Sequence, residues 1–264
     1  MSAPLRVVVR GTGDVGSAVA HVLHSAGMRV VMHDVAAPAH TRRGMSFTDA
    51  MFEGKAELAG LFAKRSGEPS RLREMLNCGR AVPVVAGDVM DVVREVAPDA
   101  LIDARMRKRA VPECQRDLAR CTIGLGPNFT AGQQTDVAVE TGWGDSLGSV
   151  VRAGATRPLE GEPREIAGYG RARYLYAPSP GVFVTTLGIG ARVQAGELVG
   201  SVGDARLLAP LSGRLRGLTH SGVAVEAGTK VVEVDPREEA AEIYGLGARP
   251  HRIALGVLEA LRSL

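Results

Sequence analysis

The sequence predicts an α/β protein in which a parallel-sheet domain precedes a small all-β module and a C-terminal helix. Three observations support this fold class: a glycine-rich turn between a short apolar run and a helical stretch, an internal repeat rich in glycine and valine, and helical spacing at the end of the chain. We expect four segments: residues 1–150, a connecting segment 151–173, the β module 174–236 and a helical tail 237–264.

Composition excludes several classes of protein. Of the 264 residues, 45% are hydrophobic and 23% charged, as in ordinary folded proteins, and the net charge of +3 does not favour a nucleic-acid partner. No apolar stretch approaches the ~18 residues that a membrane span needs. The chain enters its first strand without a leader segment, so we expect a cytoplasmic protein with no membrane partner. Cys78, Cys114 and Cys121 have no metal-ligand spacing, which predicts reduced thiols and no metal site.

The first element is a buried strand over residues 5–9, followed by a Gly-x-Gly-x-x-Gly turn at 11–16 and a helix over 17–26. A second strand over 29–34 ends in Asp34, 18 residues beyond the last glycine. This order is typical of a Rossmann-like nucleotide-binding domain, in which a pyrophosphate lies on the helix N-terminus. The candidate ligand-binding residues here are Arg10, Gly11, Thr12, Gly13, Asp14, Gly16 and Asp34.

Asp34 and Asp14 favour different interpretations of this site. A carboxylate at Asp34 suits a ribose diol and would repel a 2′-phosphate, which favours NAD over NADP. Asp14 would instead place negative charge beside the phosphates. It is either a first-turn acid that satisfies the helix end by itself or the mark of a modified nucleotide site.

Three further short strands are predicted over residues 81–85, 100–103 and 122–125, with helices over 71–78 and 89–96 between them. Ligands of parallel sheets bind at the carboxyl ends of the strands. Asp103 lies at such an end. The loop 124–132, with Gly126, Pro127 and Asn128, is rich in turn residues that can form an anion-binding nest.

The β module contains two copies of one pattern, 32 residues apart. Ala177-Pro178 recurs as Ala209-Pro210, and the same spacing relates the glycines and valines of 190–202 to those of 222–234. Two such copies resemble the barrel-sandwich hybrid fold of biotinyl and lipoyl domains. Those carriers bear a modified lysine on the hairpin between the copies. The corresponding hairpin, 202–207, has no lysine, which favours a docking or structural module.

Motifs along nearly the whole chain resemble the YqeB-type accessory family of selenium-dependent molybdenum hydroxylases. They are residues 10–14, 46–50, 99–104, 124–132, 138–141, Ala177-Pro178 and 256–261. The chain departs from the family at Trp143-Gly144-Asp145, where relatives tend to have Arg-Gly-His. A more distant similarity is to xanthine dehydrogenase maturation factors.

The resemblance implies an accessory protein that handles or inserts the cofactor of a xanthine dehydrogenase-like molybdenum hydroxylase. Its partners would be that client enzyme and a nucleotide-like ligand, either NAD or a molybdopterin-type dinucleotide. Two alternatives stay open: an NAD-dependent oxidoreductase with an acid/base near Asp103, and a non-catalytic scaffold. No catalytic residue can be assigned from the spacing of the residues.

Overall fold

The computed structural model describes residues 3–107, 110–158 and 163–262 and divides the chain into two compact units. The first unit comprises residues 1–36, 46–159 and 246–264, and the second comprises 37–45 and 160–245. Each unit is therefore assembled from separate stretches of the chain, whereas the domains expected from the sequence are contiguous.

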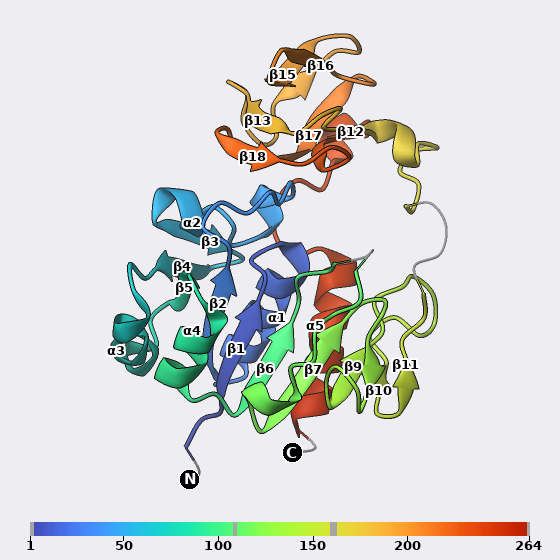
Figure 1. Ribbon diagram of the computed structural model, residues 1–264. Helices are drawn as coiled ribbons and strands as arrows, with labels where there is room; N and C mark the ends of the chain where they lie inside the picture. The colour runs from blue at the N-terminus through green and yellow to red at the C-terminus, as the bar shows by residue number, and fades with distance from the viewer. Residues whose placement is uncertain (1–2, 108–109, 159–162, 263–264) are drawn as a thin grey trace. The chain divides into compact units, whose positions relative to one another are not determined.

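The first unit contains a mixed sheet with the strand order β10-β9-β7-β6-β1-β2-β5-β4-β3 (Figure 1). The strands from β9 to β4 are parallel to their neighbours, whereas β3 and β10 are antiparallel. The strands are β1 (Arg6–Arg10), β2 (Arg29–Asp34), β3 (Lys55–Leu58), β4 (Leu61–Arg65), β5 (Val82–Ala86), β6 (Ala100–Asp103), β7 (Cys121–Leu125), β9 (Val137–Val139) and β10 (Val150–Val151). A small second sheet pairs β8 (Thr130–Ala131) with β11 (Gly154–Ala155).

Helices cover both faces of the large sheet. The helices of this unit are α1 (Asp14–Ser25), α2 (Ala50–Glu53), α3 (Leu72–Cys78), α4 (Val89–Val96) and α5 (Ala248–Arg262), with 3-10 turns at Pro69–Arg71 and Arg116–Leu118. Val7 and Val9 of β1 share a core with α1 and α5, and Val8 between them shares the opposite core with α3 and α4. The alternation along β1 thus places one apolar cluster on each side of the sheet.

The second unit consists of two antiparallel four-stranded sheets, ordered β12-β19-β17-β14 and β16-β15-β13-β18. Its strands are β12 (Tyr174–Tyr176), β13 (Gly181–Val184), β14 (Arg192–Val193), β15 (Leu198–Val202), β16 (Ala205–Leu208), β17 (Gly213–Leu218), β18 (Val223–Val225) and β19 (Lys230–Asp235). Three 3-10 turns, Arg43–Met45, Arg171–Arg173 and Glu238–Ala240, complete it.

The sequence repeat explains how these strands pair. Strands β13, β14 and β15 of the first copy correspond, 32 residues later, to β17, β18 and β19 of the second. Strand β14 pairs with β17, and β18 pairs with β13. Each copy therefore contributes one strand to the sheet of the other, which buries the repeated valines of both copies, among them Val193, Val225 and Val234.

The predicted fold class, a Rossmann-like parallel-sheet domain followed by a small all-β barrel-sandwich hybrid (biotinyl/lipoyl-like) module and a C-terminal helix, is wrong. The large sheet is mixed, because the short connections before β4 and β10 permit only antiparallel pairing. The β module forms two separate antiparallel sheets. The predicted C-terminal helix is present as α5, and its apolar face packs in the core of the first unit.

No helix within residues 3–107, 110–158 and 163–262 combines the length and the apolar character that crossing a membrane requires.

Candidate functional site

A row of polar side chains lies at the carboxyl ends of three neighbouring strands in the first unit. His33 of β2 is in register with Arg10 of β1, and Arg10 is in register with Asp103 of β6. Residues in register on adjacent strands project to the same face of a sheet, so the three side chains form a continuous row. All three are buried, with exposed fractions of 8%, 7% and 1%.

The segment after β6 covers this row with further polar groups. The Gln115 side chain donates from Nε2 to Asp103 Oδ2 at 2.7 Å and accepts from Arg10 Nη1 at 2.6 Å. Arg105 donates from Nε to Asp103 Oδ1 at 2.9 Å. Asp103 is thus held by an amide and a guanidinium, and it is ionised in a buried position.

Three arginines converge on the carboxylate of Glu113. Arg10 Nη1 lies 3.0 Å and Arg105 Nη2 2.6 Å from Glu113 Oε1, and Arg107 forms an ion pair with Oε2. The Glu113 side chain is 47% exposed, whereas that of Arg10 is 9% exposed. A partly exposed carboxylate therefore occupies the centre of a cluster of cations.

The environment shifts the pKa of each of these groups. Burial alone would raise the pKa of Asp103, but the hydrogen bonds and charge of Arg105 outweigh it and lower the pKa below its usual range. The same competition, with Arg107 and Arg105 as partners, lowers the pKa of Glu113. Burial lowers the pKa of His33, which keeps its imidazole neutral near pH 7.

Two buried nitrogens in the row, Arg10 Nε and His33 Nδ1, have no hydrogen-bond partner in the described part of the chain. The other ring nitrogen of His33, Nε2, lies 2.9 Å from the Gly87 carbonyl. Buried polar groups are almost always paired, so such atoms call for an explanation such as a bound ligand or water.

The glycine turn lies beside this row. Gly11 has a φ of +108°, and a Cβ there would lie 2.9 Å from the Ala104 carbonyl oxygen. A Cβ on Gly16 would lie 2.0 Å from the Gly11 carbonyl oxygen. Both glycines are needed because the turn, the first turn of α1 and the segment after β6 pass too close together for a side chain.

Hydrogen bonds from three segments fix the turn. Thr12 donates from its backbone N and its hydroxyl to Asp34 Oδ2, at 2.6 and 2.7 Å. The Thr12 carbonyl accepts from the hydroxyls of Ser17 at 2.8 Å and Thr48 at 2.9 Å. Asp34, predicted to bind a ribose, therefore holds the backbone of the turn itself.

Asp14 begins α1 after Gly13, and its carboxylate accepts from the Val15 backbone N at 3.0 Å. The contact places the carboxylate in the first turn of α1, and both interpretations of Asp14 made from the sequence stay predictions.

The loop after β7 lies next to the segment that carries Arg105. Gly126 approaches Met106 and Thr141, and Asn128 donates to the Ala110 carbonyl at 3.4 Å. Gly126 and Pro127 are buried, and the Gly126 carbonyl accepts from Thr156 Oγ1 at 2.8 Å. The loop is therefore held by side-chain hydrogen bonds at the same edge of the sheet.

The structure thus gathers the predicted residues at the carboxyl edge of one sheet. It adds His33, Glu113 and Gln115, which the sequence analysis did not select. A histidine at the penultimate position of an apolar strand could have identified His33. Glu113 and Gln115 lie in a stretch without periodicity, so no sequence signal marks them. Lys108 and Arg109 of the basic run 105–109 lie outside the described residues.

No protein-family model matches the chain. Three solved structures resemble it weakly. They are the ectoine utilization protein EutE (DoeB) of Ruegeria pomeroyi, an aspartoacylase family protein of Mesorhizobium loti, and a succinylglutamate desuccinylase/aspartoacylase family protein of Shewanella amazonensis, with identities of 12%, 12% and 11%. They cover 89%, 88% and 89% of this chain and 86%, 85% and 92% of their own, with TM-scores of 0.27, 0.26 and 0.24. TM-scores this low support no inference about this chain.

Sequence similarity is much stronger to one curated protein, "Uncharacterized protein YqeB" of Escherichia coli (strain K12). The chain is 33% identical to it over 258 residues, which is 98% of this chain and 47% of the relative. The chain therefore spans about half the length of the relative it matches. This agreement supports the family resemblance predicted from the motifs, and it makes the chain a sequence relative of YqeB.

Proposed function

We propose that the chain is an accessory protein for a molybdenum hydroxylase and that the carboxyl edge of its first-unit sheet holds a phosphate-bearing ligand. The ligand would be a nucleotide or a molybdopterin-type cofactor. The observation that supports this site is the convergence of Arg10, Arg105 and Arg107 on the single carboxylate of Glu113. The molybdenum part of the proposal rests on the family resemblance alone.

Glu113 acts in this proposal as an internal substitute for the ligand's anionic group. Its carboxylate presents two oxygens to three guanidinium groups, as a phosphate would with one oxygen more. Because it is half exposed and lies in a loop, it can turn away at little cost in packing. The phosphate that replaces it would also reach Arg10 Nε, which has no partner in the described residues.

The glycine turn and the loop after β7 would contact the rest of the ligand. The residues in question are Arg10, Gly11, Thr12, Gly13, Asp14, Gly16, Asp34, Asp103, Gly126, Pro127 and Asn128. Asp14 lies at the helix end and disfavours a second phosphate there, so we expect one phosphate to bind at the arginines and the base or pterin to extend along the turn.

Thermal unfolding with NAD, NADP, CDP and CTP tests the site. The cytidine nucleotides represent half of a molybdopterin dinucleotide. A ligand at about 100 times its Kd stabilises the folded state by roughly 2.7 kcal/mol, which is visible as a rise in Tm. A rise with the cytidine nucleotides supports cofactor handling, whereas a rise with NAD alone supports the oxidoreductase alternative.

Three variants test whether the rise in Tm depends on these residues. Glu113→Gln removes the competing charge, so it should bind the active nucleotide about tenfold more tightly, a gain of about 1.4 kcal/mol. Arg10→Met should abolish binding. Arg6→Met, at the other end of the same strand, is the matched control and should bind as the parent does. Weaker binding by Glu113→Gln, or no shift with any nucleotide, would refute the site.

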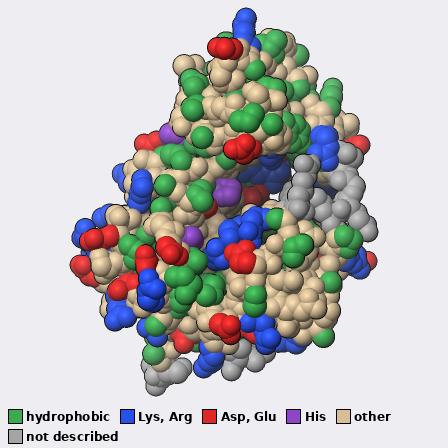
Figure 2. Space-filling model, viewed as in Figure 1, with side chains coloured by type: hydrophobic (Ala, Val, Ile, Leu, Met, Phe, Trp, Pro, Cys, Tyr) green, Lys and Arg blue, Asp and Glu red, His purple; other side chains and the backbone are tan. Residues whose placement is uncertain are grey.

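The second unit offers a surface for the client enzyme. Val182, Val184, Leu198 and Leu208 are each about half exposed, while the alternate residues Phe183, Val199 and Leu207 are buried. The four exposed side chains therefore project from the outer face of one sheet, β16-β15-β13-β18. Figure 2 shows hydrophobic side chains on the visible part of this unit. Clustered apolar side chains on a surface often mark a protein interface.

Co-purification with a molybdenum hydroxylase tests the docking surface. Val184→Ser and Leu208→Ser should weaken the complex, and Asp204→Ser, in the exposed turn between β15 and β16, should not. Equal recovery of the client with all three variants would exclude this face.

A further inference from the structure

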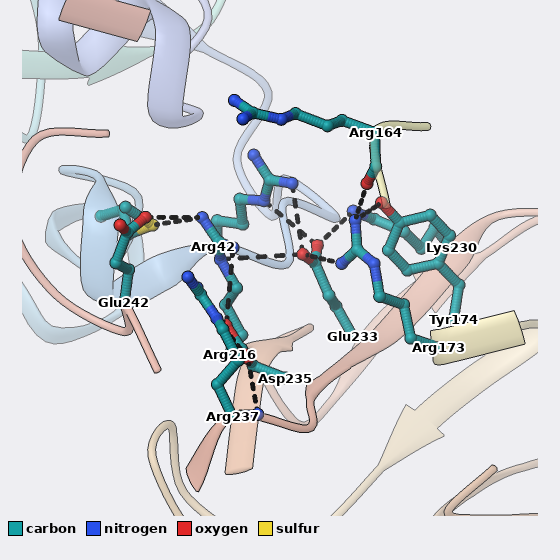
Figure 3. Close-up of polar contacts among 11 residues, drawn as sticks. Arg42, Arg164, Arg173, Tyr174, Arg216, Lys230, Glu233, Asp235, Arg237 and Glu242 are labelled. Carbon is teal, nitrogen blue, oxygen red and sulfur yellow. Dashed lines mark hydrogen bonds and ion pairs between the residues drawn. The ribbon is translucent and has the colours of Figure 1, made fainter. Parts of the chain in front are cut away.

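A second group of charged side chains surrounds Glu233 of β19 in the second unit (Figure 3). The Glu233 side chain is fully buried. Oε1 accepts from Arg173 Nη1 at 2.5 Å and Arg42 Nη2 at 3.2 Å, and Oε2 accepts from Arg42 Nε at 3.1 Å and Lys230 Nζ at 3.0 Å. Each oxygen therefore accepts two donors, which fills the acceptor capacity of the carboxylate.

Asp235, two residues further along β19, is also buried and strongly bonded. Its Oδ1 accepts from the backbone N and the Nε of Arg237, both at 3.0 Å, and its Oδ2 accepts from Arg237 Nη2 at 2.7 Å. The two buried carboxylates of this cluster are thus satisfied by Arg42, Arg173, Lys230 and Arg237.

Arg216 of β17 reaches the same cluster, but no oxygen of the described residues lies at hydrogen-bond distance from its guanidinium. Its Nε lies 3.7 Å from Glu233, its Nη1 3.6 Å from Asp235 and its Nη2 3.8 Å from Glu242. The nearest hydrogen-bonding contact is the thioether of Met45, at 4.0 Å from Nη2. Arg216 Nε has no hydrogen-bond partner within the described ranges, although the side chain is only 9% exposed.

Burying Arg216 in this way costs folding free energy in the protein without a ligand. A guanidinium presents five N–H donors and no acceptor, and a buried charge without hydrogen bonds forfeits its hydration. Burial and the nearby charge of Arg42 lower the pKa of Arg216. Among the described residues, the cluster contains five cations, Arg42, Arg173, Arg216, Lys230 and Arg237, and three carboxylates, Glu233, Asp235 and Glu242. The formal charges of these eight side chains sum to +2, which a dianion would neutralise.

The cluster extends to the surface of the unit. The side chains of Arg42, Lys230 and Arg237 are about a quarter exposed, and that of Glu242 is 64% exposed. Glu242 lies on the Nη2 side of Arg216, so an anion can approach the N–H edge of the guanidinium from that side when Glu242 turns outward.

We propose that Arg216 is the centre of an oxyanion site in the second unit, which takes a phosphate-type dianion either free or as the phosphoryl group of a larger molecule. The guanidinium would bind two of its oxygens through a parallel pair of hydrogen bonds. The proposal is independent of the nucleotide site, since it involves other residues of another unit.

Isothermal titration of the full chain with inorganic phosphate and with the monoester ribose 5-phosphate tests this site. We expect binding that Arg216→Met weakens at least tenfold. Arg216→Lys, which keeps the positive charge but cannot form the parallel pair of hydrogen bonds, should bind with intermediate affinity. Arg206→Met, which changes an exposed arginine of the same unit, should bind as the parent does. Tighter binding of inorganic phosphate indicates a free anion, and tighter binding of the monoester indicates a phosphoryl group.

Stability in phosphate-free buffer separates an anion site from a structural ion pair. Because Glu233 and Asp235 keep their other partners, Arg216→Met should leave Tm unchanged or raise it. A large fall in Tm would mean that the three long ion pairs already satisfy Arg216, and it would overturn the proposal. Full phosphate affinity in Arg216→Met, or no binding of either probe by the parent chain, would do the same.

Discussion

Arginine supplies most of the buried positive charge of this chain. Only four of its 32 basic residues are lysine. Arg10, Arg173 and Arg216 are buried, and in each the Nε has no hydrogen-bond partner in the part of the chain that the structure describes. Arginine suits such positions because its guanidinium stays charged and binds carboxylates or phosphates through a planar fork. At Arg173 the guanidinium donates to Glu233 and Tyr174, whereas Arg10 and Arg216 are the arginines at which we propose that ligands bind.

Asp103 should make stability depend on pH. Its pKa is lowered in the folded state, so its contribution is fully present above the unfolded pKa of ~3.9 and is lost as pH falls through the folded value. Unfolding by urea between pH 7 and pH 3 should show this loss. Asp103→Asn should destabilise the protein by about 2 kcal/mol at pH 7, because a charged hydrogen-bond partner of Arg105 is lost. The difference between the variant and the parent should shrink toward pH 3, and a constant difference would contradict this account.

Gly16 should be needed for packing although it lies in a helix. Alanine normally stabilises a helix relative to glycine by ~1 kcal/mol. At Gly16 a Cβ would meet the Gly11 carbonyl oxygen at 2.0 Å, so we expect Gly16→Ala to destabilise by about 1–3 kcal/mol in denaturant unfolding. Gly67→Ala is the control, since nothing lies within 4 Å of a Cβ there. Equal stability of the two variants would mean that α1 shifts freely.

The residues of the glycine turn could be predicted because their spacing is local. Arg10, Asp34 and Asp103 each end a strand, and parallel strands bring their ends to one edge. Glu113 could not be predicted, because its place depends on the path of an irregular segment. The hydrogen-bond partner of Asp34 could not be predicted either. The sequence does not show whether a carboxylate at a strand end accepts from a ribose or from the Thr12 backbone.

At the scale of elements, the strands predicted over residues 5–9, 29–34, 81–85, 100–103 and 122–125 are confirmed as β1, β2, β5, β6 and β7. The edge strands β3 and β4 were not predicted. Both are short, and each has one buried residue, so hydrophobic periodicity does not reveal them. A hairpin at the edge changes a parallel sheet into a mixed one.

The helix α5 should contribute to the stability of the first unit. Ile253 is fully buried in the core that contains α1 and β1, while Leu255 is 38% exposed on the same helix. We expect Ile253→Ala to destabilise by about 2–5 kcal/mol and Leu255→Ala by less than 1 kcal/mol, measured by urea unfolding. Similar small losses in both variants would indicate that α5 is an appended tail.

At the scale of the whole molecule, the sequence did not allow us to predict which segments of the chain belong to which unit. The repeat revealed two related halves, because equal spacing survives in the sequence. It did not reveal that residues 37–45 belong to the second unit and 246–264 to the first. Those assignments depend on contacts between distant segments, such as the hydrogen bond from the Leu218 backbone N to the Thr41 carbonyl at 2.8 Å.

Arg42 provides a test of this discontinuous assembly. It lies more than 100 residues before the main stretch of the second unit, yet it donates two hydrogen bonds to buried Glu233. Arg42→Gln should therefore destabilise the second unit by about 2 kcal/mol, since Glu233 keeps Arg173 and Lys230 but loses its bidentate partner.

Hydrogen exchange read by mass spectrometry can locate the effect of this variant. Amides of β17 and β19 should exchange faster in Arg42→Gln, and those of β1 and β2 should keep the protection they have in the parent. Arg43→Gln, the neighbouring arginine, is the matched control for the charge change. Faster exchange confined to β1 and β2 would mean that residues 37–45 stabilise the first unit instead. The expected pattern requires that a nine-residue segment folds with a β module encoded more than a hundred residues later.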